Sequence, residues 1–202
     1  MGRTILLTGP PGVGKTTIIQ QVVARLPGRA GGFYTAELRE HGQRVGFRLV
    51  TLDGEEGLLA HVASRSPYRV GRYGVDLADL ERVGVAAIRQ AIAARDLVVI
   101  DEIGKMELFS AAFKAAVQEA VDSPKPVLGT ITFRPHPWAD GLKRHPNVQL
   151  LVVTLANRQT MAERVVGFVG GEVGAKHLPG NDRASQIVEQ MLRPYIPEEV
   201  QR

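Results

Sequence analysis

Apolar and polar positions repeat on two length scales along this chain. Four mainly apolar runs predict buried strands, and they lie at residues 4–8, 97–100, 126–132 and 148–155. Runs without polar alternation are typical of strands that are covered on both faces in a parallel sheet. Apolar residues at helical spacing predict helices at residues 18–26, 76–94, 109–122, 161–168 and 184–193. The alternation predicts an α/β fold of three layers, in which helices cover both faces of a mostly parallel central sheet.

One stretch departs from this strand-and-helix alternation. Residues 33–40 and 43–52 are β-type runs on either side of His41-Gly42, and they predict a β-hairpin added to the sheet. Residues 57–62 could form a further short strand. Charged residues within the hairpin indicate that one of its faces is exposed to solvent.

A glycine-rich loop joins the first predicted strand to the first helix. It fits the phosphate-loop pattern G-x-x-x-x-G-K-[ST] and comprises Gly9, Pro10, Pro11, Gly12, Val13, Gly14, Lys15, Thr16 and Thr17. Glycines at these positions let the backbone curl so that successive N–H groups point at an anion. We expect Lys15 to reach the β- and γ-phosphates of a nucleotide and the Thr16 hydroxyl to ligate Mg²⁺.

The buried run at residues 97–100 ends in two carboxylates, Asp101 and Glu102. Ligands bind at the carboxyl ends of strands in open α/β sheets, so this strand end predicts the second half of the site. Asp101 is expected to hold Mg²⁺, and Glu102 to activate water as a general base. Lys105 could face the phosphates or the solvent, and Glu107 could be a supporting carboxylate or an ordinary residue at a helix start.

Other residues are weaker candidates for the site. Any of three arginines, Arg65, Arg69 and Arg72, could stabilise charge on the γ-phosphoryl group. His136 lies in a proline-rich loop that follows a strand, where a catalytic base is possible and a solvated histidine more common. Asn157 and Arg158 follow the last strand, at a corner that often meets the nucleobase. The guanine-selecting pattern N-K-x-D is not met there, which argues against strict guanine selection.

Length and composition limit the possible classes of protein. The 202 residues predict a single domain, 1–202, with the hairpin 33–52 as an excursion and residues 170–202 as a C-terminal extension. The chain has no cysteine, so thiolate metal sites and nucleophiles are excluded. No apolar run reaches the ~18 residues of a membrane span, and the first strand begins too early for a signal peptide, which favours the cytoplasm.

The net charge of +4 makes a nucleic-acid partner possible. The basic residues are scattered along the sequence, however, and do not form a block or a stripe with interleaved aromatic residues. The sequence therefore does not indicate a nucleic-acid partner, and a mildly basic surface around a polyphosphate site accounts for the charge.

These motifs resemble a family of small nucleoside-triphosphatases known from thermophiles, whose vertebrate relatives are called cancer-related nucleoside-triphosphatases. The resemblance covers about residues 3–160 and rests on three segments in the same order, residues 9–16, 32–35 and 98–107. It implies a monomeric phosphate-loop NTPase fold of the RecA-like kind. It also implies slow, Mg²⁺-dependent hydrolysis of ATP, GTP and other nucleoside triphosphates.

The resemblance also implies roles for individual residues. It implies that residues 9–16 bind the phosphates, that Asp101 holds the metal and that Glu102 is catalytic. A second nucleotide-binding segment would comprise Val98, Val99, Ile100, Asp101, Glu102, Ile103, Gly104 and Lys105. The chain departs from many members at Gln159, where those members have an acidic residue.

Hydrolysis of ATP, GTP, CTP and UTP is the leading functional hypothesis, with Lys15 and Glu102 as catalytic residues. A kinase for a nucleotide or a nucleic-acid 5′ end could use the same loop and metal, but it would require an acceptor. A nucleotide-gated interaction switch is a third hypothesis, in which hydrolysis only resets the bound state.

Overall fold

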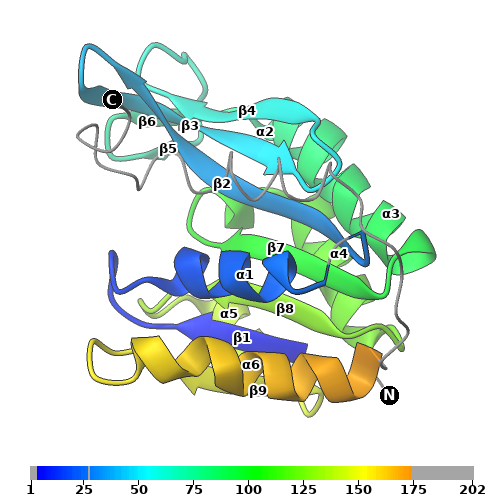
Figure 1. Cartoon of the computed structure of the whole chain (residues 1–202). Coiled ribbons are helices and arrows are strands. Elements are labelled where there is room, and N and C mark those ends of the chain that lie inside the picture. Colours follow the sequence, from blue (N-terminus) through cyan, green and yellow to red (C-terminus); the bar gives the residue numbers. More distant parts are fainter. Residues whose placement is uncertain (1–3, 27, 174–202) are drawn as a thin grey trace.

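A computed structural model describes residues 4–26 and 28–173 of the chain. One sheet of nine strands runs through it in the order β5-β6-β4-β3-β2-β7-β8-β1-β9 (Figure 1). The strands are β1 (Thr4–Thr8), β2 (Ala30–Glu40), β3 (Gln43–Thr51), β4 (Glu56–His61), β5 (Arg69–Val70), β6 (Tyr73–Val75), β7 (Leu97–Ile103), β8 (Val127–Ile131) and β9 (Val148–Val152).

The parallel half of the sheet contains β2, β7, β8, β1 and β9. Strand β1 lies between β8 and β9, with Ile5 opposite both Leu128 and Gln149. All five residues of β1 and of β8 are buried, as the apolar runs predicted. Because these strands are parallel, their carboxyl ends lie along the same edge of the sheet.

The antiparallel half begins on β2, which pairs with β7 along its first residues and with β3 along its outer length. The predicted hairpin is confirmed, and its tight turn consists of His41 and Gly42, both of which have positive φ. The predicted short strand is also confirmed as β4, and β6 and β5 extend the sheet further. The hairpin is therefore the start of a longer antiparallel extension (Figure 1).

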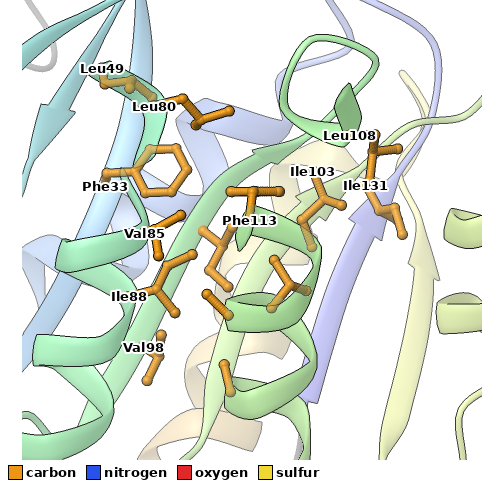
Figure 2. Packing of buried hydrophobic residues seen from close by; sticks show 14 of the residues in the cluster. Phe33, Leu49, Leu80, Val85, Ile88, Val98, Ile103, Leu108, Phe113 and Ile131 are labelled. Carbon is orange, nitrogen blue, oxygen red and sulfur yellow. The ribbon is translucent and has the colours of Figure 1, made fainter. Parts of the chain in front are cut away.

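Helices cover both faces of the sheet, as predicted. The helical segments are α1 (Lys15–Ala24), α2 (Leu77–Asp79), the π-helix η1 (Leu80–Val85), α3 (Ala86–Ala94), the 3₁₀-helix η2 (Glu107–Phe109), α4 (Ala111–Asp122), α5 (Pro137–Lys143) and α6 (Arg158–Val173). Helices α1 and α6 lie side by side on one face (Figure 1). Helices α3 and α4 cover the other face, where Phe33, Ile88 and Phe113 meet in a buried core (Figure 2).

Several predicted elements differ in detail. Residues 77–94 are helical throughout, with the Asp76 carboxylate capping the first turn, but the segment contains the π-helix η1. Phe109 was predicted in the buried stripe of a helix and is 39% exposed, because α4 starts only after the Ser110 cap. Part of the predicted loop around His136 is the short helix α5, which Pro137 can begin because its missing N–H is not needed there. The helix predicted at 184–193 and most of the predicted extension 170–202 lie outside the described residues.

Candidate active site

The phosphate loop connects the buried end of β1 to the first turn of α1. Gly9 and Gly14 have positive φ values of 152° and 103°, and Gly14 is the N-cap of α1. A Cβ atom on Gly9 would lie 2.4 Å from the carbonyl oxygen of Val153, so the loop passes too close to the backbone after β9 for any side chain. The loop thus presents its backbone at a helix N-terminus, which is an arrangement that favours anions.

Lys15 lies over this loop. Its Nζ donates to the carbonyl oxygens of Gly9 at 3.0 Å and Pro10 at 3.2 Å. Its positive charge also lowers the pKa values of both Asp101 and Glu102, against the larger effect of burial. The structure therefore brings the predicted lysine and the two predicted carboxylates into one electrostatic environment.

Asp101 lies in β7 and is 1% exposed. Its Oδ1 accepts a hydrogen bond of 2.6 Å from the Thr130 hydroxyl of β8, while its Oδ2 is buried and has no hydrogen-bond partner among the described residues. Burial raises the pKa of Asp101, although the nearby hydroxyls of Thr130 and Thr16 lower it. A buried carboxylate oxygen that accepts no hydrogen bond is free to bind a cation.

The Thr16 hydroxyl and the Asp101 carboxylate fit a magnesium ion. Both are hard oxygen donors, and Mg²⁺ usually takes one or two carboxylates together with substrate phosphates and water. Within residues 4–26 and 28–173, no group of three or more His, Cys, Asp or Glu residues could hold a metal by itself. Phosphate oxygens of a bound nucleotide would therefore have to complete the coordination.

Glu102 follows Asp101 and is partly exposed. Burial raises the pKa of its carboxyl group, the negative charge of Asp101 raises it further, and Lys15 opposes both effects. A carboxylate with a raised pKa is a stronger base than an ordinary surface carboxylate. Glu102 is thus suited to accept a proton from water at the end of β7.

Glu107 is a third carboxylate at this strand end, and the sequence did not settle its role. Its side chain is 4% exposed, and its Oε2 accepts the backbone N–H of Gly104 at 3.1 Å. A Cβ on Gly104 would lie 2.9 Å from that oxygen and 3.0 Å from Oε1 of Glu102, so a larger residue here would have to displace one of the two carboxylates. Burial and the nearby Glu102 raise the pKa of Glu107 to about 8.

The turn that carries Glu107 is anchored to the core. Leu108 is 5% exposed and lies beside Ile131, near Ile103 (Figure 2). Ser110, which follows the turn, donates to Glu81 at 2.7 Å and accepts the N–H of Phe113. The turn that carries the Glu107 carboxylate is therefore fixed by the packed residues that follow it.

The predicted second nucleotide-binding segment divides into two groups. The side chains of four residues are fully buried in the two cores on either face of the sheet, namely Val98, Val99, Ile100 and Ile103. Their side chains therefore support β7 and do not line a nucleotide site, because a strand covered on both faces leaves only its end accessible. Lys105 is exposed, and the polar atoms that remain for a ligand belong to Asp101, Glu102 and the backbone near Gly104.

Asn157 and Arg158 lie where the chain enters α6. The Cδ atom of Arg158 would be 3.9 Å from a Cβ on Gly14, which places its stem beside the phosphate loop. The Asn157 amide bonds its own loop, accepting from the Thr154 N–H at 2.8 Å and donating to the Val152 carbonyl at 2.9 Å. A contact between Asn157 and a nucleobase stays a prediction and would require one of these bonds to be exchanged.

Among the weaker candidates, Arg69, Arg72 and His136 have other partners in this structure, and a role for Arg65 stays a prediction. Arg69 and Arg72 bond backbone carbonyls of the antiparallel extension. His136 caps α5, with its Nδ1 accepting the N–H of Ala139 at 3.4 Å. These hydrogen bonds give each side chain a structural role outside the loop and the carboxylates.

Helices long and apolar enough to cross a membrane are absent from the described part of the chain.

Comparison with known proteins gives consistent matches. A family model described as NTPase matches residues 4–166. A nucleoside-triphosphatase THEP1 from Thermotoga sp. strain RQ2 is 45% identical over 172 residues, which are 85% of this chain and 98% of that protein. A cancer-related nucleoside-triphosphatase homolog from Bos taurus is 39% identical over 182 residues, covering 82% of this chain and 96% of that protein.

Two solved structures also resemble this fold. The crystal structure of THEP1 from the hyperthermophile Aquifex aeolicus superposes with a TM-score of 0.75 at 36% identity, covering 83% of this chain and 99% of that one. The solution structure of a human cancer-related nucleoside triphosphatase gives a TM-score of 0.73 at 37% identity, covering 87% of this chain and 100% of that one. Both proteins are covered almost from end to end.

Proposed function

This chain belongs to the NTPase family and is a nucleoside-triphosphatase, and from that premise we propose that it hydrolyses the γ-phosphate of ATP, GTP, CTP and UTP. The proposal includes dependence on Mg²⁺, slow turnover and broad tolerance of the base. One observation supports this proposal above all. The phosphate-loop lysine is close enough to Asp101 and Glu102 for its charge to lower the pKa values of both carboxyl groups.

Binding would rest on the triphosphate. The backbone N–H groups of the loop, which Pro10 and Pro11 lack, and the N-terminus of α1 would bind the phosphate oxygens. The Lys15 ammonium would exchange its bonds with Gly9 and Pro10 for the β- and γ-phosphates, which are stronger acceptors because they are charged. Thr16 and Asp101 would hold Mg²⁺, which supplies positive charge against the phosphate oxygens when it is bound there.

Glu102 would act on the attacking water. Its carboxylate accepts a hydrogen bond from the water, orients the oxygen in line with the γ-phosphorus, and takes the proton as the new P–O bond forms. The bond from the γ-phosphorus to the β–γ bridging oxygen breaks. The products are a nucleoside diphosphate and inorganic phosphate, and Glu102 returns the proton to solvent.

Broad base tolerance and slow turnover follow from what surrounds the phosphates. Arg158 and Thr160 replace the Lys and Asp of the guanine-selecting pattern, and the amide of Asn157 is engaged by its own loop. Arg69 and Arg72 are bonded to the antiparallel extension, so neither is placed to stabilise charge on the γ-phosphoryl group. An added arginine accelerates such reactions by about 10³–10⁵-fold, so turnover is expected to be slow unless Arg65 or Arg158 reaches the γ-phosphoryl group.

Phosphate release tests this proposal. We expect the wild-type chain with Mg²⁺ to release phosphate from all four nucleoside triphosphates without an acceptor. Glu102→Gln should still bind them and lose on the order of a hundredfold or more in kcat, because the amide cannot accept the proton. Glu119→Gln is the matched control, since this exposed carboxylate of α4 pairs with Arg89 and should not affect turnover.

Two outcomes would contradict the proposal. Full activity of Glu102→Gln would remove the general base from the mechanism. Consumption of triphosphate only after addition of a nucleotide or a nucleic-acid 5′ end would make the protein a kinase.

A further inference from the structure

Arginines that are scattered in the sequence gather at the outer end of the antiparallel extension. The arginine surface, as we define it, comprises Arg39, Arg44, Arg69, Arg72, Phe47 and Tyr73. It combines the outer ends of β2 and β3 with β5 and β6, which lie at one end of the sheet (Figure 1). These residues do not form a basic stripe along the sequence, and strand pairing brings their side chains to the same end of the sheet.

Stacking fixes the arginine planes. The guanidinium of Arg44 lies 5.2 Å from the ring centre of Phe47 and 5.9 Å from that of Tyr73, and Arg72 lies 5.3 Å from Tyr73. The Nε of Arg44 also donates to the Tyr73 hydroxyl at 3.2 Å. A guanidinium that is already ordered loses little side-chain entropy when it binds an anion.

The charge of these arginines is only partly compensated. Arg69 donates to the Ser64 and Arg72 carbonyls at 2.9 and 2.6 Å, and Arg72 donates to the Arg44 carbonyl. Such bonds satisfy donors without neutralising charge, and no carboxylate in the described residues forms an ion pair with Arg69 or Arg72. Elsewhere, arginines pair with carboxylates, as in Arg25–Glu163, Arg29–Asp96, Arg89–Glu119 and Arg95–Asp53.

The net charge of this region is positive. Arg39, Arg44, Arg69 and Arg72 provide four positive charges, and the carboxylates of Glu37 and Glu40 remove two, which leaves +2. Glu37 bonds both Arg39 and Arg44. The pKa of the Tyr73 hydroxyl is lowered, first by its hydrogen bond with Arg44 and then by that with Arg72, as expected in a positive field.

An exposed aromatic pair lies next to this surface in the chain. Tyr68, immediately before β5, is 44% exposed, and its ring lies 5.5 Å from that of Phe109. Exposed rings and ordered arginines together are the combination that binds single strands, in which bases stack on aromatic rings and phosphates contact cations. The bases of a duplex are already stacked on one another, so they are not free to stack on an exposed aromatic ring.

We propose that the arginine surface binds single-stranded nucleic acid, with phosphates on Arg44, Arg69 and Arg72 and a base stacked on Tyr68. The surface shares no residue with the phosphate loop or the carboxylates of β7. Binding there is a function separate from nucleotide hydrolysis.

Fluorescence anisotropy of a labelled uridine oligonucleotide tests the proposal on the full chain. We expect binding that weakens as salt rises, because each phosphate contact releases counterions, with a slope of about −0.7 per contact. The double variant Arg69→Gln/Arg72→Gln should weaken binding by at least about tenfold and reduce the slope. Tyr68→Ala should weaken it by about tenfold through lost stacking.

Controls separate this surface from the rest of the molecule. Arg25→Gln/Arg89→Gln removes the same number of charges from paired arginines and should bind like the wild type. Lys15→Ala should also bind normally, because the phosphate loop is a different site. Rates of nucleotide hydrolysis in the Arg69→Gln/Arg72→Gln and Tyr68→Ala variants should match the wild type, which shows that these variants are folded.

Three results would overturn the proposal. The first is equal oligonucleotide binding by the wild type and by Arg69→Gln/Arg72→Gln, including no binding by either. The second is a duplex of equal length that binds as tightly as the single strand. The third is a pair of results: inorganic polyphosphate displaces the labelled oligonucleotide as well, per charge, as unlabelled oligonucleotide does, and Tyr68→Ala does not weaken binding. The surface would then recognise charge alone.

Discussion

At the scale of single residues, three carboxylates near the end of β7 have different environments. Asp101 is buried and has one oxygen without a partner, Glu102 is partly exposed, and Glu107 is buried against the backbone of Gly104. Different environments let neighbouring carboxylates take different protonation states and roles. At neutral pH, Glu107 is mainly protonated, and its proton limits the negative charge next to Glu102.

The raised pKa of Glu107 predicts a pH-dependent stability. Its pKa is about 8 in the folded protein, whereas the ordinary pKa of a glutamate is about 4.5, so between these values the folded state keeps a proton that the unfolded state has lost. Rising pH should therefore lower the free energy of unfolding in this window, by at most about 1.4 kcal/mol per pH unit. Glu107→Gln keeps the acceptor for Gly104 and loses this dependence. Urea denaturation of both proteins at about pH 5 and about pH 8 measures the difference.

Glu119→Gln provides the control for that experiment. The hydrogen bond from Arg89 lowers the pKa of Glu119, so its titration lies below the window and the variant should keep the slope of the wild type. Identical slopes for Glu107→Gln and the wild type would show that Glu107 is ionised in the folded protein.

At the scale of elements, the start of α4 depends on one hydroxyl. Ser110 is 1% exposed and accepts the N–H of Phe113 at 3.0 Å. Ser110→Ala should lower the free energy of unfolding by about 1–2 kcal/mol, because that N–H loses its acceptor, whereas Ser110→Gly should cost only a few tenths. Chemical denaturation of both variants measures this. A free energy of unfolding for Ser110→Ala equal to that of the wild type would mean that the cap contributes little.

Contiguous motifs could be predicted from the sequence, and elements that depend on distant partners could not. The phosphate loop and the acidic end of β7 are each encoded in a few adjacent residues whose types the chemistry requires. The exposure of Phe109 depends on where Ser110 starts α4, and the burial of Glu107 depends on the turn that Leu108 anchors beside Ile131. The arginine surface depends on β5 and β6 pairing beyond the hairpin. Local residue types do not determine such pairings.

At the scale of the whole molecule, the two halves of the sheet should differ in local stability. Helices cover both faces of the parallel half, whereas β5 and β6 are short and end the antiparallel half. Amide hydrogens of β7 and β8 should exchange only through global unfolding, and those of β5 and β6 at least about tenfold faster through local opening. Hydrogen exchange by NMR measures both, and uniform protection across the sheet would contradict this expectation.

The position of β1 in the sheet has a consequence for synthesis of the chain. Within the described residues, the neighbours of β1 are β8 and β9, so Ile5 meets Leu128 and Gln149. The phosphate loop is therefore translated well before β8, and within the described residues its strand has no hydrogen-bonded neighbour until β8 has left the ribosome. The β2–β3–β4 segment, whose partners are adjacent in sequence, can pair much earlier. A nascent chain that ends before β8 has the nucleotide-binding motif without the sheet that supports it.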